Sequence, residues 1–248
     1  MENQGITGLP EGLFTNLAAP EKLKALYLDD CMIKDMHEAV FHPLVNLEVL
    51  NLNFNEIEVL QDELLKLPKL RQFSISGDPT PPESEVPVFG PGGGRKPGKL
   101  TSDGFSNKVF QYTNKLERLI MYGNPGITEL HDGMFEGLNK VHTMFFVFCG
   151  LTNAGIPDGV FEPLTSMVYF DFQGCPFTSL PKEWFEDGGW SKNIERLAFF
   201  ACEITEVDEE VFSWHPKLKQ VYLHANPGLD FIPASFYENL EDLEILTI

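Results

Sequence analysis

Apolar residues recur along this chain in a pattern with the period of a short β-strand. In LKALYLDDC, residues 23–31, the central L-x-L alternates apolar and outward-facing positions, as a strand does. The same pattern, L-x-x-L-x-L-x-x-N/C, begins at nine places: Leu23, Leu47, Leu70, Leu116, Val141, Met167, Ile194, Leu218 and Leu243. Asp78 is the one exception in the last position, and the ninth copy is cut off. Apart from the interval 70–116, the copies begin 23 to 27 residues apart. The pattern predicts nine short strands.

A second pattern fills the rest of each period. An aliphatic residue is followed five positions later by a large apolar residue, usually Phe, and the chain contains 21 Phe in all. The pairs are Leu9/Phe14, Met36/Phe41, Leu60/Leu65, Leu100/Phe105, Leu130/Phe135, Ile156/Phe161, Leu180/Phe185 and Val207/Phe212, while Ile232/Phe236 is one residue shorter. Because no repeat can bury its own leucines, neighbouring repeats must stack. We expect the Phe positions to form part of this shared core rather than a cofactor site.

The two patterns together resemble the leucine-rich repeat family, in its "typical" subclass. That consensus is L-x-x-L-x-L-x-x-N-x-L-x-x-L-P-x-x-x-F-x-x-L, and both GLPEGLF (8–14) and SLPKEWF (179–185) contain its L-P-x-x-x-F portion. The periods also fall in the range of such repeats. The resemblance implies an α/β leucine-rich repeat solenoid, a curved right-handed superhelix with a parallel sheet on its concave face and short helical or irregular segments on its convex face. We expect one domain, 1–248, with about nine repeats.

The ends of the chain differ from those of the family's secreted members. The sequence begins and stops inside a repeat, and it has no cysteine-rich cap at either end. Uncapped repeats expose core leucines. We therefore expect this chain to be a segment of a larger protein, or to have its ends covered by a partner.

One period is much longer than the others, because Leu70 and Leu116 are 46 residues apart. The excess is the Pro/Gly-rich stretch 79–99, which includes GGRKPGK at 93–99. A phosphate-binding loop would need Ser or Thr after Lys99, where this chain has Leu100. We interpret 79–99 as an insertion in the fourth repeat. It is either a tolerated surface loop or a contact loop that presents Arg95, Lys96 and Lys99.

The four cysteines, Cys31, Cys149, Cys175 and Cys202, all occupy the N/C position of the strand pattern. There the side chain turns inward and bonds backbone groups, and a thiol is a small, weakly polar substitute for Asn. We expect four reduced structural thiols. No Cys or His residues have the spacing of a metal site, so we expect neither metal nor cofactor.

Charge excludes some partners. Asp plus Glu number 37 against 18 Lys plus Arg, which gives a net charge of -19. Such a surface repels nucleic acid and anionic membranes and favours a partner with basic margins. The longest apolar run, MFFVFC at 144–149, is too short to insert into a membrane. No signal peptide is visible, so the compartment stays unknown: the resemblance slightly favours the extracellular side or cell surface, and an intracellular location stays open.

The strand positions that face away from the core are unusually aromatic and poor in acids from Leu116 onward. The candidate ligand-binding residues on this concave face are Arg118, Tyr122, Phe145, Tyr169, Arg196, Phe200, Tyr222 and His224. Arg118 and Arg196 occupy the same position three repeats apart, and we expect them to orient an acidic group of the ligand. Contiguous exposed apolar surface usually marks an interaction site. No catalytic constellation is visible. We expect a non-enzymatic module that binds a protein or peptide there; the alternative is an assembly subunit of a larger complex that docks through its ends and the insertion loop.

Overall fold

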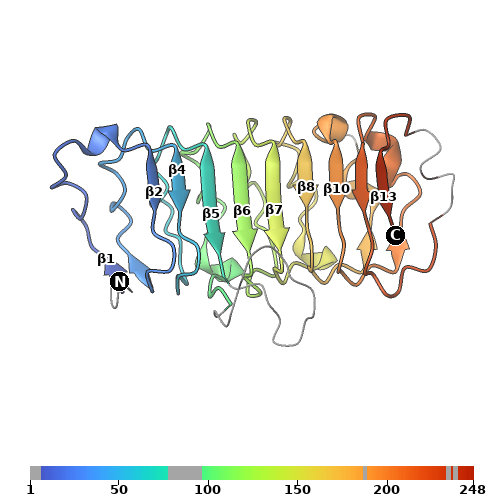
Figure 1. Cartoon of the computed structure of the whole chain (residues 1–248), viewed down its shortest axis with the longest axis horizontal. Coiled ribbons are helices and arrows are strands. Elements are labelled where there is room, and N and C mark those ends of the chain that lie inside the picture. The colour runs from blue at the N-terminus through green and yellow to red at the C-terminus, as the bar shows by residue number, and fades with distance from the viewer. Residues whose placement is uncertain (1–6, 78–96, 187–188, 233–235, 237–239) are drawn as a thin grey trace.

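A single parallel β-sheet runs the length of the molecule (Figure 1). The structure is a computed structural model that describes residues 7–77, 97–186, 189–232, 236 and 240–248. The sheet has nine strands in the order β13-β12-β10-β8-β7-β6-β5-β4-β2. They are β2 (Ala25–Tyr27), β4 (Val49–Asn51), β5 (Gln72–Ser76), β6 (Arg118–Tyr122), β7 (Thr143–Val147), β8 (Tyr169–Asp171), β10 (Arg196–Ala198), β12 (Gln220–Tyr222) and β13 (Ile245–Thr247). The nine predicted strands and the solenoid are confirmed.

The register of the sheet places equivalent repeat positions side by side. Tyr169 on β8 pairs with Thr143 on β7 and with Arg196 on β10, and the same spacing continues along the sheet. Side chains at one repeat position therefore form rows across the strands, with neighbouring strands about 4.8 Å apart. Because alternate residues of a strand point to opposite faces, one set of rows enters the core and the other faces outward.

The opposite side of the solenoid is made of turns, short 3-10 helices and two small parallel sheets. The small sheets pair β1 (Gly8–Leu9) with β3 (Asp35–Met36), and β9 (Ser179–Leu180) with β11 (Glu206–Val207). The 3-10 helices are η1 (Pro20–Lys22), η2 (Ser102–Gly104), η3 (Asn153–Gly155), η4 (Lys182–Trp184), η5 (Ser191–Asn193) and η6 (Val211–Trp214). No α-helix occurs in the part of the chain that the structure describes.

Stacked side chains fill the space between these two layers. Leu50, Phe73, Leu119, Met144 and Phe170 come from one inward row of successive strands, and each is fully buried. In a second row the rings of Phe146, Phe172 and Phe199 stack in turn, with centroids 5.3 and 5.6 Å apart. Burying a side chain of this size contributes roughly 1.5–3 kcal/mol, so the stacked rows supply most of the solenoid's stability.

A ladder of Asn and Cys residues ties successive turns together at the position that the sequence predicts. The amide of Asn55 donates to the carbonyls of Leu28 (2.7 Å) and Leu52 (2.9 Å), and its oxygen accepts from the backbone N–H groups of Cys31 and Ile33. Cysteines continue the ladder, with Sγ distances to carbonyl oxygens of the preceding repeat of 3.5 Å (Cys149), 3.3 Å (Cys175) and 3.1 Å (Cys202). All four cysteines are buried and free of disulfides.

The fourth repeat differs from the predicted assignment of Leu100 and Phe105. The phenylalanine that stacks on Phe135 is Phe110, at 6.4 Å between ring centroids, and Phe135 in turn stacks on Phe161 at 6.3 Å. Phe105 follows Gly104, whose carbonyl accepts from the N–H of Leu60 in the preceding repeat. Phe105 therefore takes the aliphatic position, and the Leu100/Phe105 assignment was wrong by five residues. The long insertion before it removes the fixed spacing from the strand that defines these positions elsewhere.

The two described residues that flank the insertion lie against each other. Residues 78–96, which include most of the predicted insertion 79–99 with Arg95 and Lys96, lie outside the described residues. Gly77 donates to the carbonyl of Tyr122 (2.7 Å) and Gly98 donates to that of Gly123 (2.8 Å). A Cβ added to Gly77 would lie 1.8 Å from the nitrogen of Gly98, so two glycines are needed where the chain leaves and rejoins the solenoid.

Deletion of residues Pro81 to Pro97 is expected to leave the solenoid folded. Gly77 and Gly98 are already in contact, so three residues can close the gap, and loop closure depends only weakly on loop length. We expect the free energy of unfolding, measured by urea titration with circular dichroism, to change by less than about 1 kcal/mol. Leu100→Ala in the full chain is the positive control, since Leu100 is fully buried and its truncation costs roughly 2–5 kcal/mol. Loss of cooperative unfolding in the deletion would show that the insertion belongs to the core.

Candidate binding surface

The outward rows of the nine-stranded sheet, here called the concave face, form a hollow across the middle of the molecule. Its volume is about 780 Å³, and it crosses the strands from β4 to β10. The lining residues are Asn51, Asn53, Phe54, Gln72, Ser74, Ser76, Arg118, Ile120, Tyr122, His142, Thr143, Phe145, Val147, Tyr169, Asp171, Gln173 and Arg196. A hollow of this size on the outward face of the sheet can receive side chains of a partner.

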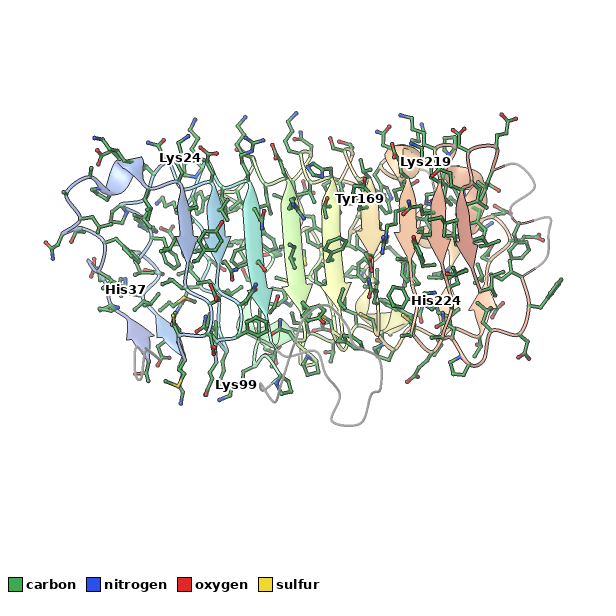
Figure 2. All side chains as sticks on the ribbon, in the orientation of Figure 1. Lys24, His37, Lys99, Tyr169, Lys219 and His224 are labelled. Atoms are coloured by element: carbon green, nitrogen blue, oxygen red, sulfur yellow. The ribbon has the colours of Figure 1, made fainter. Side chains whose placement is uncertain are left out.

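Five of the eight residues predicted for the concave face line this hollow. They are Arg118, Tyr122, Phe145, Tyr169 and Arg196. Tyr169 is 41% exposed, and Figure 2 shows it on β8, near the middle of the sheet. Tyr122 and Phe145 are half-buried, with Tyr122 packed edge-on against Phe148 at 6.2 Å. These aromatic side chains are held in place while part of each stays accessible.

The other three predicted residues, Phe200, Tyr222 and His224, lie beside the hollow toward the C-terminal end. The rings of Phe200 and His224 stack at 4.5 Å, and His224 also meets Tyr222 edge-on at 6.3 Å (labelled His224 in Figure 2). The guanidinium of Arg196 lies over the ring of Tyr222, 4.5 Å from its centroid. These contacts make a rigid aromatic rim next to the hollow.

The N-terminal half of the hollow was missed by the sequence prediction. Asn51, Asn53, Gln72, Ser74 and Ser76 make this half polar and nearly uncharged, and Ser74 donates to the side-chain oxygen of Asn53 at 2.7 Å. All five residues occupy the outward positions of the strand pattern, which were inspected only from Leu116 onward. Extending the inspection to the copies at Leu47 and Leu70 would have found them, because the row register is the same.

A buried polar cluster lies at the C-terminal end of the hollow and joins β8 to β10. The side chains of Gln173 and Arg196 both donate to Oδ2 of Asp171, at 3.0 and 3.1 Å. Asp171 is 1% exposed and Gln173 4% exposed, although both face outward from the sheet. Burial raises the pKa of the Asp171 carboxyl to about 6, while Arg196 and Gln173 act in the opposite direction. We call these three residues the Asp171 cluster.

The basic residues of the insertion are only partly within the described chain. Lys99 forms an ion pair with Glu56 at 2.9 Å and lies within 3.8 Å of Glu58. The hydrogen bond to Glu56 raises the pKa of Lys99. Figure 2 places Lys99 at the edge of the sheet where strands end, opposite the edge where Lys24 and Lys219 lie. Lys99 is thus tied to the solenoid, and the predicted contact role of Arg95 and Lys96 stays untested.

Other kinds of site find no counterpart in the described part of the chain. No group of three or more His, Cys, Asp or Glu residues there is arranged to hold a metal ion. None of the helices among those residues has the length and apolarity needed to cross a membrane. The polar groups that line the hollow are amides, hydroxyls, the imidazole of His142, the guanidinium of Arg118 and the Asp171–Arg196 ion pair, and they suit hydrogen bonding to a ligand.

Known proteins share both the sequence pattern and the architecture. The family profile described as "Leucine rich repeat" matches residues 21–79, which contain β2, β4 and β5. The chain is a leucine-rich repeat protein. No curated protein is similar to it in sequence at a significant level. The "typical" subclass stays a prediction.

Solved leucine-rich repeat structures superpose over nearly the whole chain at low identity. A chain in the "Octameric complex of Latrophilin 3 (Lec, Olf), Unc5D (Ig, Ig2, TSP1) and FLRT2 (LRR)" is 18% identical, with a TM-score of 0.56 over 96% of this chain and 76% of that one. The leucine-rich repeat domain of APL1B is 18% identical, with a TM-score of 0.64 over 94% of this chain and 66% of that one. A leucine-rich repeat protein of Leptospira interrogans is 18% identical, with a TM-score of 0.65 over 98% of this chain and 57% of that one. These likenesses establish the shared fold.

The leucine-rich repeat fold commonly mediates protein–protein interaction, and such domains are typically non-enzymatic binding modules. The first of these three neighbours was solved as part of a protein complex. Function nevertheless depends on the residues of each site rather than on the fold.

Proposed function

We propose that this protein is a non-enzymatic recognition module that binds a protein or extended peptide across the concave face. The observation that carries the proposal is the hollow of about 780 Å³, lined by Tyr122, Phe145 and Tyr169 on three adjacent strands. Aromatic side chains bury large areas at low entropic cost and are enriched among the residues that dominate binding energy. The polar N-terminal half of the hollow would hydrogen-bond the ligand and fix its register.

Charge defines the kind of partner further. The chain has a net charge of -19. The hollow itself is close to neutral, because the carboxylate of Asp171 is paired with Arg196 and the exposed Arg118 adds one positive charge. A partner with basic margins would be attracted by the surrounding acids, and its neutral or apolar centre would meet the hollow. The association rate should therefore fall as the salt concentration rises. Arg118 would orient an acidic group on the ligand.

Alanine substitution of Phe145 is expected to weaken ligand binding by about 2 kcal/mol, roughly thirtyfold in Kd. Phe145 lies between Ile120 and Asp171 in its row and is only half-buried, so its truncation should barely change the fold. The measurement is titration calorimetry or surface plasmon resonance with a peptide selected on the full chain. The matched control is Glu209→Ala, an exposed acid outside the hollow, which should alter only the association rate.

Normal ligand binding by the Phe145 variant would favour the alternative function, an assembly subunit of a larger complex. If the Phe145 variant binds normally while variants away from the concave face fail, the concave site is wrong. Light scattering separates the two functions independently, because a recognition module should be monomeric until its ligand is added. A subunit should self-associate, and Phe231, at 73% exposure, is the residue to substitute in that case.

A further inference from the structure

The Asp171 cluster contains polar atoms that have no hydrogen-bond partner. Within the described chain, Asp171 Oδ1, Gln173 Oε1 and Arg196 Nε are all buried and unpartnered. The three residues line the hollow, and Asp171 and Gln173 are more than nine-tenths buried. Buried polar groups are nearly always hydrogen-bonded, and leaving three together unpaired is costly. A polar ligand group that reached the cluster would therefore complete its hydrogen bonds.

The orientation of the Gln173 amide follows from its neighbour. Asp171 Oδ2 accepts from both Arg196 and Gln173, so the NH₂ group of Gln173 must face the carboxylate. The carbonyl oxygen of Gln173 is then the atom left over. The cluster offers two acceptor oxygens, one from Asp171 and one from Gln173, and one N–H donor from Arg196.

Charge balance decides which groups can enter. The carboxylate of Asp171 and the guanidinium of Arg196 already neutralise each other at 3.1 Å. A cationic or anionic ligand group would leave an uncompensated charge beside a carboxylate that is 1% exposed, and that is strongly unfavourable. A neutral polar group adds no charge to the cluster.

Among neutral side chains, the numbers of donors and acceptors select one class. A hydroxyl supplies one donor and a backbone peptide unit also supplies one, whereas a primary carboxamide supplies two donors and one acceptor oxygen. Two donors and one acceptor complement the two free oxygens and the one free N–H of the cluster. We propose that the Asp171 cluster is a specificity subsite that receives an asparagine or glutamine side chain of a protein or peptide bound in the hollow.

This inference rests on the proposed function, since it names what one part of the concave ligand carries. Arg196 and Tyr222 support it, because the guanidinium is held over the aromatic ring at 4.5 Å and keeps its place at the edge of the subsite.

The test is selection of random peptides, displayed on phage, against the full chain and its variants. On the wild-type chain, one position of the selected peptides should be enriched in Asn or Gln roughly tenfold or more. A peptide without a carboxamide at that position would leave the buried polar atoms of the cluster unpaired. Arg196→Gln removes the positive charge and keeps a donor toward Asp171. Asp171 then lacks its cationic partner, and a cationic ligand group would restore the pairing, so the preferred residue at that position should change to Lys or Arg.

The matched control is Arg71→Gln, which removes the same charge outside the hollow, where Arg71 pairs with Glu117 at 2.8 Å. It should leave the Asn/Gln preference unchanged. Peptides that lose binding with Phe145→Ala but show no Asn/Gln preference, or that prefer Lys, Arg, Asp or Glu on the wild-type chain, would overturn the subsite and leave the proposed function standing. Failure to select any peptide sensitive to Phe145→Ala would overturn both.

Discussion

Replacement of Cys175 with aspartate is expected to lower the free energy of unfolding by roughly 3–5 kcal/mol, which could prevent folding altogether. Cys175 is fully buried between the Cys149 and Cys202 repeats, and its thiol donates to the carbonyl of Phe146 at 3.3 Å. Burial raises the pKa of the Cys175 thiol well above its usual range, which shows how poorly a negative charge is accommodated there. A carboxylate at this position would meet carbonyl oxygens with no cation to pair with.

Two further variants separate charge from size. Cys175→Asn places in this repeat the residue that Asn55, Asn124 and Asn226 already provide in others, where each bonds backbone groups. It should be far less destabilising than the aspartate variant, although the two side chains are nearly the same size. Urea unfolding followed by tryptophan fluorescence gives the comparison. Equal stabilities of the Asp and Asn variants would show that the ladder position tolerates charge and that its hydrogen bonds are unimportant.

The fold could be predicted almost completely because the repeat pattern that defines it can be recognised in short stretches of the sequence. Each strand needs only the L-x-L alternation, and each turn is closed by an Asn or Cys such as Asn55 or Cys175. Since every repeat contacts mainly its neighbours, a local pattern is sufficient to specify the whole solenoid. The exception was Phe105, where the insertion separates the two halves of a repeat and spacing alone could not assign the position.

The site was harder to predict because exposure on a concave face depends on neighbouring repeats. Asp171 occupies an outward-facing position of the strand pattern, yet it is 1% exposed. Its neighbours in the row are Phe145 and Ala198, and Arg196 reaches across from the adjacent strand to bond it. The sequence shows that Asp171 and Arg196 are 25 residues apart, but only the register of β8 and β10 shows that their side chains meet.

The same comparison explains why Arg196 was assigned a different role. From sequence it was expected, with Arg118, to orient an acidic group of the ligand. In the structure the guanidinium of Arg196 forms an ion pair with Asp171 and lies over the ring of Tyr222. An acid of the protein itself therefore already uses part of its hydrogen-bonding capacity. Arg118 is exposed and keeps the predicted role in the proposed function. A ligand acid would have to compete with Asp171 for Arg196, and this is why a neutral amide is the better fit.

Two buried groups are expected to give the wild-type protein opposing pH-dependent contributions to stability. Burial raises the pKa of Asp171 to about 6, and burial lowers the pKa of His215 to about 4. His215 is fully buried and packs edge-on against Phe185 at 4.8 Å. In the unfolded chain the two groups return to ordinary pKa values of about 3.9 and 6.5. Each therefore binds protons differently in the folded and unfolded states.

The signs of the two contributions are opposite. The folded state holds the Asp171 proton more tightly than the unfolded state, so this stabilising contribution is complete below about pH 4 and is lost as the pH rises through 6. The folded state disfavours protonated His215, so its contribution is complete above about pH 6.5 and is lost as the pH falls through 4. Between about pH 4 and 6 each changes stability by about 1.4 kcal/mol per pH unit, and the two changes cancel.

Single variants should reveal the two pH-dependent contributions to stability, which cancel in the wild type. Relative to wild type, Asp171→Asn should gain about 3 kcal/mol of stability between pH 4 and 6, because only the wild type loses the Asp171 contribution. His215→Leu should lose a similar amount relative to wild type over the same range, and the double variant should follow the wild-type profile. Urea unfolding of all four proteins at each pH measures these differences, and subtracting the wild type removes the titration of the remaining carboxylates. Parallel profiles for the two single variants would show that at least one of these groups stays accessible to water in the folded protein, because only burial separates their pKa values from those of the unfolded chain.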